Sequence, residues 1–373
     1  MPIESPTNSA ESIDDFARGP RALDGNLRPG PKKSQDRAWL HLLSPPAGGA
    51  LRPGRRPVRA AAVAAARGRR RGIAAGAVDP GAGERVAQHD RRGAPVAFMF
   101  LTRGPLPLAP LWDKFFAGAG AGGRELYSVY VHATPGYRPE FPPASPFYRR
   151  QVPSQVARWG ETNMLDAERR LLANALLDPS NERFVLVSES CVPLYGFSVV
   201  YHYLTRSRHS FVGAFDDPSP HGRGRYRAGL APEVRPEQWR KGAQWFEVGR
   251  AVAVDVVVAD DRYYPKFREH CRPPCYVDEH YLPTVLSVEA PARIANRSVT
   301  WVDWSRGGAH PATFGEADVD EELLRRLTAP GKDQGTCTYN GQPAEVCFLF
   351  GRKFAPNTLQ RLLALAPKML GYG

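Results

Sequence analysis

Two carboxylates and a histidine stand side by side at the head of an apolar segment: Asp278-Glu279-His280 within CYVDEHYLPTVL, residues 275–286. Two kinds of chemistry fit this pattern. Carboxylates in the first turn of a helix stabilise its N-terminus, where backbone amides lack partners. A carboxylate held beside a substrate hydroxyl can instead remove its proton. The apolar run predicts a buried helix, and the pattern leaves open which carboxylate caps that helix and which one reacts.

A pair of cations offers a second kind of chemistry. Arg352 and Lys353 follow an apolar run in FLFGRKFAP and precede a predicted helix. A departing diphosphate gains negative charge in the transition state, and cationic side chains or a metal ion must then stabilise it. Basic residues on a loop are also commonly just solvated, so the pair alone does not decide between the two interpretations.

Patterns for other phosphate chemistry are missing from the sequence. It contains no GxxxxGK[ST] and no GxGxxG after the first predicted strand, which argues against nucleoside-triphosphate hydrolysis and dinucleotide binding. Only Asp318-Val319-Asp320 has the Asp-x-Asp spacing with which sugar transferases often hold a metal. It lies in GEADVDEELLRRL, which is typical of a solvated acidic helix start. We therefore expect no metal cofactor.

The cysteines show no zinc-finger spacing, so a structural metal is not expected either. Five cysteines allow two disulfides and one free thiol. Cys337 and Cys347 bracket TYNGQPAEV, in which Asn-Gly could turn the chain back on itself. A bridge between them and two buried free thiols both remain open. The sequon at Asn296 would carry a glycan only in a chain that enters the secretory pathway.

Strand-like and helix-like segments alternate from about residue 94 onward, which predicts an α/β fold with a largely parallel sheet flanked by helices. The polar ends of such strands are where ligands bind. A Pro/Gly/Arg-rich loop over 216–242 is expected to lie over a site. The expected strands are 96–101, 126–136, 182–190, 210–215, 243–250, 298–305 and 346–356. The expected helices are 108–118, 161–177, the apolar segment that follows the acidic pair within 275–286, and one from Asn357. Residues 252–270 are expected to supply a strand or helix and then a helix.

Residues 1–93 form a basic segment, rich in Arg, Ala, Gly and Pro over 51–93, that we predict to be disordered. Much of the net charge of +12 therefore lies outside the folded part. A nucleic-acid-binding arm would interleave aromatic residues for stacking, and this segment has almost none. No nucleic-acid partner is expected, and no run of about 20 apolar residues could span a bilayer.

Eight segments occur in an order that resembles the core-2/I-branching β-1,6-N-acetylglucosaminyltransferases, most closely their plant branch. These are VAFMFLTRG, YSVYVHA, RWGETNMLDAERRLLANAL, FVLVSESCVPL, WRKGAQWFEVGR, CYVDEHYLPT, VTWVDWSRGGAHP and CFLFGRKFAP. The resemblance covers residues about 94–370. It implies a GT-A-type catalytic domain over 94–373, with a nucleotide-binding half at about 94–200 and an acceptor half at about 201–373. It also implies an inverting, metal-independent transfer of a sugar from a UDP donor to a glycan hydroxyl.

Roles follow from the resemblance by position. Glu279 matches the family's catalytic base, Asp278 then being the helix cap, and Lys353 matches its diphosphate-binding lysine. The remaining candidates for donor binding are Arg352, the first strand's exit (Leu101, Thr102, Arg103) and the second strand's exit (His132, Ala133, Thr134). At the second exit the family usually has an aspartate that contacts the nucleoside. Acceptor-side candidates are Trp245, Asp278, Trp304 and His310, because sugars bind against aromatic faces. Trp159-Gly160 resembles a core element of the family.

Several alternatives stay open at this stage. The donor sugar is expected to be N-acetylglucosamine, with glucuronic acid as the alternative in related plant enzymes. A carbohydrate-binding protein that has kept the fold without turnover is a rival from another class. The family resemblance also implies a glycan or glycoprotein acceptor, a Golgi membrane location and a luminal catalytic domain. The expected membrane anchor has no counterpart in this sequence.

Overall fold

The computed structural model describes residues 93–308, 310–328 and 337–373. The prediction of a disordered tail falls almost entirely outside these residues. A first, four-stranded sheet is formed by β1 (Val96–Leu101), β2 (Tyr127–His132), β3 (Arg183–Ser188) and β5 (Glu247–Gly249). Its order is β2-β1-β3-β5; β1 runs parallel to β2 and β3, and β5 is antiparallel to β3. The predicted α/β fold with a mostly parallel sheet is confirmed.

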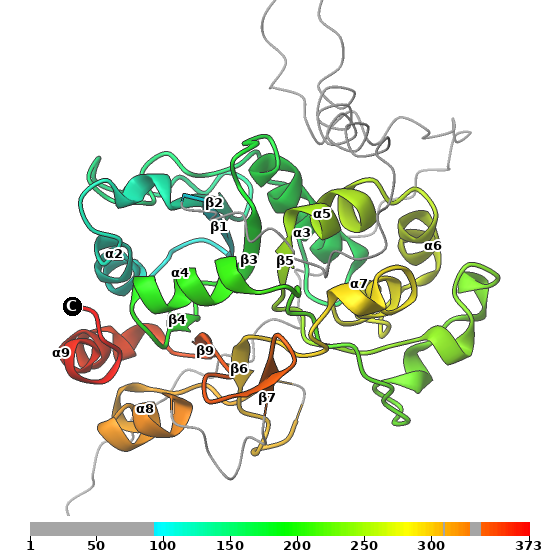
Figure 1. The fold of residues 1–373 in the computed structure, drawn as a ribbon. Helices are drawn as coiled ribbons and strands as arrows, with labels where there is room; N and C mark the ends of the chain where they lie inside the picture. The colour runs from blue at the N-terminus through cyan, green and yellow to red at the C-terminus, as the bar shows by residue number, and fades with distance from the viewer. Residues whose placement is uncertain (1–92, 309, 329–336) are drawn as a thin grey trace, which may run out of the picture. The chain divides into compact units, whose positions relative to one another are not determined.

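Helices cover both faces of this sheet (Figure 1). Helices α2 (Ala109–Ala117) and α4 (Phe197–Arg206) share one core cluster with alternate residues of β1, and α3 (Thr162–Ala175) contacts β1, β2 and β3. On the α2 face the rings of Phe98 and Phe100 meet Trp112 edge-on, at centroid distances of 6.1 and 4.9 Å. Every residue of β1 and β3 is buried, because both strands are covered on both faces.

A second, smaller sheet brings distant parts of the chain together. It consists of β4 (Val192–Pro193), β9 (Phe350–Arg352) and β6 (Thr300–Val302), in the order β4-β9-β6. Strand β9 is parallel to β6 and antiparallel to β4. Since β4 follows directly on β3, this pairing draws the Arg352-Lys353 segment to the end of the first sheet where its parallel strands terminate.

The segment after β5 resolves an open prediction. Residues 250–258 are helical, as α5 (Arg250–Val252) followed by a π-helical turn (Ala253–Val258), and α6 (Tyr263–His270) follows. Helix α7 (Val277–Glu289) confirms the helix expected after the acidic pair, and α8 (Glu321–Thr328) and α9 (Leu359–Met369) complete the chain. The strand expected at 210–215 is wrong. Ser210 and Phe211 make only isolated bridges, because neighbouring residues pair with different segments: Ser210 with Ile294 and Phe211 with Glu247.

The hairpin β7 (Cys337–Tyr339) and β8 (Gln342–Ala344) is closed by a disulfide between Cys337 and Cys347, with 5.8 Å between their Cα atoms. Its turn residues Asn340 and Gly341 both have positive φ, as the Asn-Gly pair of a tight hairpin requires. Cys271 and Cys275 form a second disulfide, and Cys191 is a buried free thiol.

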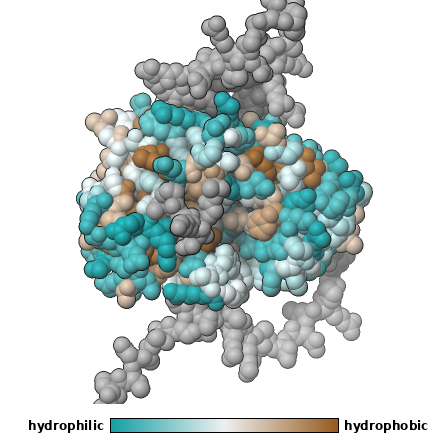
Figure 2. Space-filling model, turned by 60° about the horizontal axis from the view of Figure 1, so that its bottom comes forward, coloured by the Kyte–Doolittle hydropathy of each residue, from teal (hydrophilic) through white to brown (hydrophobic). Residues whose placement is uncertain are grey.

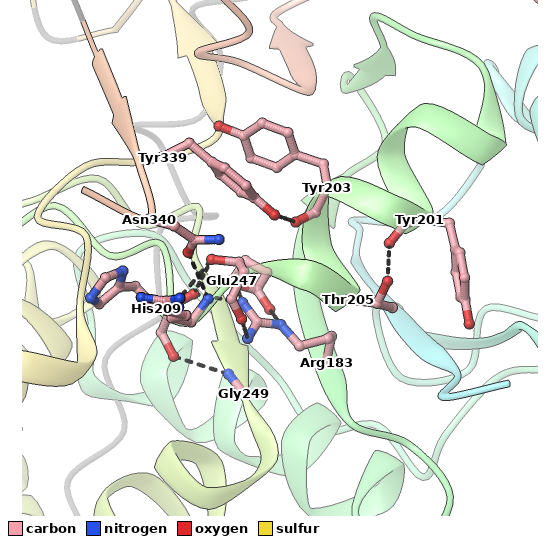
Figure 3. A network of polar contacts seen from close by, with 12 residues as sticks. Arg183, Tyr201, Tyr203, Thr205, His209, Glu247, Gly249, Tyr339 and Asn340 are labelled. Carbon is pink, nitrogen blue, oxygen red and sulfur yellow. Dashed lines mark hydrogen bonds and ion pairs between the residues drawn. The ribbon is translucent and has the colours of Figure 1, made fainter. Parts of the chain in front are cut away.

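A polar network fastens this hairpin to the main sheet (Figure 3). The Asn340 carboxamide accepts from Arg208 N at 2.8 Å and donates to Arg206 O at 3.1 Å, at the end of α4. Nearby, Arg183 of β3 forms a buried ion pair with Glu247 of β5 at 2.6 Å and donates to His209 O. The network thus joins the hairpin, α4 and the antiparallel edge of the sheet.

The described surface is mixed in character. Figure 2 shows hydrophobic residues as small patches separated by hydrophilic ones. The large hydrophobic side chains that are exposed are Val156, Trp159, Leu177, Val199, Phe215 and Trp304. Within the described ranges, no helix has both the length and the apolar character needed to cross a membrane.

Candidate active site

Glu279 lies in the first turn of α7 with its carboxylate reaching the surface, its side chain being 23% exposed. Arg225, from the 216–242 loop, donates to Glu279 Oε2 from Nη1 at 2.7 Å. The Glu279 carbonyl accepts from Gly242 N at 2.9 Å, which ties the start of α7 to the end of the same loop. A carboxylate with one bound oxygen and access to solvent suits a group that exchanges protons with a ligand.

Asp278 has a different environment from its neighbour. It is 4% exposed, and its Oδ1 has no hydrogen-bond partner among the described residues. Burial, and secondarily the charge of Glu279, raise the pKa of Asp278 to about 7. Asp278 lies in the first turn of α7, whose N-cap Tyr276 makes no side-chain capping bond. Its burial also removes it from the acceptor-side surface.

A further buried carboxylate stands near Asp278. Glu168 of α3 is 1% exposed and accepts from Gln244 Nε2 at 2.9 Å. Burial, and then the charge of Asp278, raise the pKa of Glu168 well above its usual value. Glu168, Asp278 and Glu279 are called the carboxylate group below. Burial favours the protonated form of Glu168 and Asp278, and Glu279 is the member of the group that reaches solvent.

His280 packs and does not face the site. It is fully buried, its ring stacks on Trp239 at 4.4 Å, and its Nδ1 lies 2.8 Å from Arg240 O. Burial lowers the pKa of His280 to about 3, so the ring is neutral. This agrees with the expectation that the histidine beside the acidic pair orients or packs.

Lys353, Arg352 and Arg103, called the cation group below, lie where the parallel strands end. Burial lowers the pKa of Lys353 to about 8, with additional effects from the charges of Arg352 and Arg103. Glu189, directly after β3, has a smaller opposing effect on the same pKa. Because Arg103 follows β1 closely, these effects place Lys353 beside the carboxyl ends of β1 and β3, the usual ligand-binding edge of a parallel sheet.

The guanidinium of Arg352 lies over the ring of Trp245, 4.1 Å from its centroid. Trp245 is 6% exposed. The buried Trp245 ring therefore packs against the Arg352 guanidinium. The prediction that Trp245 forms an acceptor-side wall is wrong, because its ring is not at the surface.

One short segment connects the two groups. Gly242 N binds the Glu279 carbonyl, Gln244 binds Glu168, and Trp245 lies under Arg352. Three peptide units separate Gly242 from Trp245, so this connection spans roughly 11 Å at most. The carboxylate group and the cation group are thus both held by this one segment.

The exits of β1 and β2 contribute less than predicted. Leu101 and Ala133 are buried, and the Thr102 hydroxyl is bonded within its own turn to Gly104. His132 is 1% exposed, its Nε2 accepts from Gln155 N at 3.2 Å, and burial lowers its pKa to about 4. Of the six exit candidates, only Arg103 and Thr134 are exposed.

Aromatic rings gather on the other side of Glu279. Tyr276, the N-cap of α7, has the Arg225 guanidinium 4.2 Å from its ring centroid. The Tyr276 ring contacts Trp159 at 4.7 Å, and Trp159 contacts His310 at 4.8 Å. Trp159 is 45% exposed. Trp159, Tyr276 and His310 are called the aromatic group below. Trp304 is 51% exposed and lies in the loop after β6.

Sequence reasoning missed Arg225 and Tyr276 as site residues. Arg225 is one of several arginines in a loop without regular spacing, and it meets Glu279 across 54 positions. Tyr276 lies within CYVDEHYLPTVL, directly after Cys275 and before the predicted helix. That position next to Glu279 was the sequence feature that could have marked it as a site residue.

Among the described residues, no group of three His, Cys, Asp or Glu side chains is arranged to hold a metal ion. Asp318 and Asp320 instead accept backbone hydrogen bonds from Gly315 and Leu323, at 2.7 Å each. The sequon residue Asn296 is exposed, and its Oδ1 accepts from Ala214 N at 2.7 Å.

A mostly parallel α/β sheet that carries cations at its carboxyl edge and a solvent-facing carboxylate opposite them has the features of a group-transfer enzyme acting on phosphate-activated substrates. Comparison with known proteins makes this specific. The family model described as Core-2/I-Branching enzyme matches residues 96–328. The chain is 38% identical over 321 residues to Glycosyltransferase BC10 of Oryza sativa subsp. japonica, an alignment covering 73% of this chain and 77% of that one. The protein belongs to the Core-2/I-Branching family, which confirms the resemblance to its plant branch.

Membership makes the chain a glycosyltransferase, acting with a nucleotide-sugar donor and a glycan acceptor. The two sides of the site can be matched to these substrates. Cations at a sheet edge suit the donor's phosphates, and a carboxylate suits an acceptor hydroxyl.

Proposed function

We propose that the protein transfers a sugar from a UDP donor to a glycan hydroxyl with inversion at the anomeric carbon, without a metal ion. Glu279 removes the proton of the acceptor hydroxyl while the oxygen of that hydroxyl forms a bond to the anomeric carbon of the donor sugar. The bond between that carbon and the diphosphate oxygen breaks on the opposite side. Lys353 and Arg352 stabilise the negative charge that develops on the departing UDP.

The observation that carries this proposal is the connection of Glu279 to the cation group through the segment 242–245. In-line displacement needs the base and the leaving group on opposite sides of the reacting carbon. Segment 242–245 contacts both groups, and its end residues Gly242 and Trp245 have Cα atoms no more than roughly 11 Å apart. Lys353 is only half-buried, so its ammonium can reach a ligand at the sheet edge.

The donor sugar in this proposal is N-acetylglucosamine, and glucuronic acid is the alternative. The experiment is hydrolysis and transfer from UDP-N-acetylglucosamine, UDP-glucuronic acid, UDP-glucose and UDP-galactose by the full chain, with and without EDTA. We expect one donor to be turned over at a rate that chelation does not change. Loss of activity in EDTA with recovery on adding Mn²⁺ would overturn metal independence, and binding of a donor without any turnover would favour a carbohydrate-binding protein.

The same family relationship leads us to propose a Golgi location with the catalytic domain in the lumen. Two disulfides among the described residues support this, since such bonds persist in oxidising compartments. A chain in that compartment would be glycosylated at the exposed Asn296. Expression in plant cells should give a chain whose gel mobility changes on glycosidase treatment, and Asn296→Gln should abolish the change.

A further inference from the structure

Trp159 combines exposure with fixed placement. Nearly half of this large apolar side chain faces solvent, yet its ring is held between Tyr276 and His310. The three residues come from segments more than 30 positions apart, before α3, before α7 and after β6. An exposed tryptophan that three segments converge to hold is a preformed binding surface, because exposure of such a ring by itself does not favour folding.

The backbone around this tryptophan is shaped to hold it. Tyr276 has φ +52°, a left-handed conformation that aromatic residues rarely adopt, and it follows directly on the Cys271–Cys275 disulfide. Gly160 has φ +80°, and a Cβ there would lie 3.2 Å from the Tyr276 ring. Both features let the Tyr276 ring pack closely against the 159–160 turn, where it contacts the Trp159 ring at an interplanar angle of 49°. Outliers of this kind cluster at ligand-binding sites.

The position of the aromatic group relative to the base indicates its ligand. Arg225 contacts both the Tyr276 ring and the Glu279 carboxylate, so the surface begins one side chain away from the base. The cation group is reached from Glu279 through a different set of contacts, by way of segment 242–245. Trp159 is joined to the proposed base through Tyr276 and Arg225, a chain that includes no member of the cation group.

We propose that Trp159 is the stacking platform for the pyranose ring of the acceptor and determines which acceptor glycan is used. The inference rests on the proposed function, because it takes Glu279 as the base. The apolar C–H face of the pyranose lies on the exposed indole, Tyr276 and His310 hold the indole in place, and Arg225 offers hydrogen bonds to ring hydroxyls. The platform recognises a neutral hexopyranose, and a free nucleotide does not need it.

The test compares Trp159→Ala, Trp159→Phe and Leu177→Ala in the full chain. Leu177 is similarly exposed, at 48%, but follows the far end of α3. We expect Trp159→Ala to raise the acceptor KM about tenfold or more, the scale of one lost stacking contact, with donor KM and donor hydrolysis changed less than about twofold. Trp159→Phe should restore most of the acceptor affinity, and Leu177→Ala should match the wild type. An unchanged acceptor KM in Trp159→Ala, or a parallel loss of donor hydrolysis and thermal stability, would overturn the proposal.

Direct binding separates this inference from the proposed function. Titration of the full chain with lactose, cellobiose and β-1,3-galactobiose in the presence of UDP, followed by calorimetry, needs no turnover. Binding of one disaccharide that weakens about tenfold in Trp159→Ala supports the platform, even if no donor is turned over. Equal affinities of the wild type and Trp159→Ala for every disaccharide bound, or no binding of any of them, would count against it.

Discussion

The cation group and the carboxylate group stand on different kinds of structure. Arg352 is the last residue of β9, the central strand of the second sheet, and its guanidinium lies over the buried Trp245; Lys353 follows it directly. Glu279 sits at a helix start and is contacted by Arg225 from an irregular loop. In the proposed function the cation group holds the donor's diphosphate, and the carboxylate side holds the acceptor hydroxyl. Changes on the two sides should therefore affect different substrates.

The largest effect on the donor side is expected for Lys353→Ala. Removing one preorganised charge from a developing anion costs roughly 100- to 1,000-fold in rate, and kcat/KM for the donor should fall by that factor. The pKa of Lys353 is lowered to about 8, so its charge is present below this pH and lost above it. Wild-type affinity for UDP should accordingly weaken as pH rises through about 8. Lys353→Arg should keep its affinity across that range, and a pH profile identical in both would contradict the assignment.

On the carboxylate side, the next largest effect is one on stability. The pKa of Asp278 is raised to about 7 from an ordinary value of 3.8. The folded state thus holds this proton more tightly, and the resulting stability is complete below about pH 4 and lost as pH rises through about 7. Relative to that of the wild type, the free energy of unfolding of Asp278→Asn should rise by about 3 kcal/mol between pH 5 and pH 8, at about 1.4 kcal/mol per pKa unit. Urea denaturation at the two pH values measures this, and a constant difference between the proteins would refute it.

The two disulfides also differ between the sides. The Cys337–Cys347 bridge closes a loop of 10 positions next to β9, and the Cys271–Cys275 bridge closes one of 4 before α7. In the chain-entropy model the longer loop contributes about 3 kcal/mol and the shorter about 2 kcal/mol. Paired Cys→Ser variants of each bridge, compared by thermal unfolding, should follow this order. The reverse order would show that local packing outweighs loop entropy here.

The smallest effect is expected for Arg225→Ala. Arg225 donates to one oxygen of Glu279 and covers Tyr276, so its loss leaves the base less well oriented without removing it. We expect kcat to fall about tenfold, equivalent to about 1.4 kcal/mol, with UDP affinity unchanged. Arg223→Ala, from the same loop and paired with Asp216 at an exposed position, is the matched control. Equal effects of both changes would indicate a general disturbance of the loop.

The sequence predicted the parts of the fold that depend on local pattern. Strands β1, β2 and β3 and helices α3 and α7 follow from apolar runs and helical spacing, which are properties of neighbouring residues. The 210–215 segment has the same apolar character, but its partners Ile294 and Glu247 allow only single bridges. Whether an apolar run becomes a strand thus depended on partners that no local pattern encodes.

The site was predicted less completely, for the same reason. Glu279 and Lys353 were located by family resemblance, and the structure adds their surroundings. The meeting of Arg225 with Glu279, the burial of Asp278 and the placement of Trp245 under Arg352 all join residues far apart in sequence. Trp245 illustrates the difficulty best. It was predicted as an acceptor-side wall, yet it is only 6% exposed because it packs under Arg352.

The most direct test of the division between the two sides is made on one variant, Glu279→Gln. Its transfer rate with the preferred donor and its affinity for UDP are measured on the same preparation. The account predicts that transfer falls at least about 100-fold, the scale of a lost general base, while the Kd for UDP stays within about twofold of the wild type. Transfer that persists, or UDP binding that is lost together with transfer, would contradict the claim that Glu279 is the base and that the cation group alone holds the nucleotide.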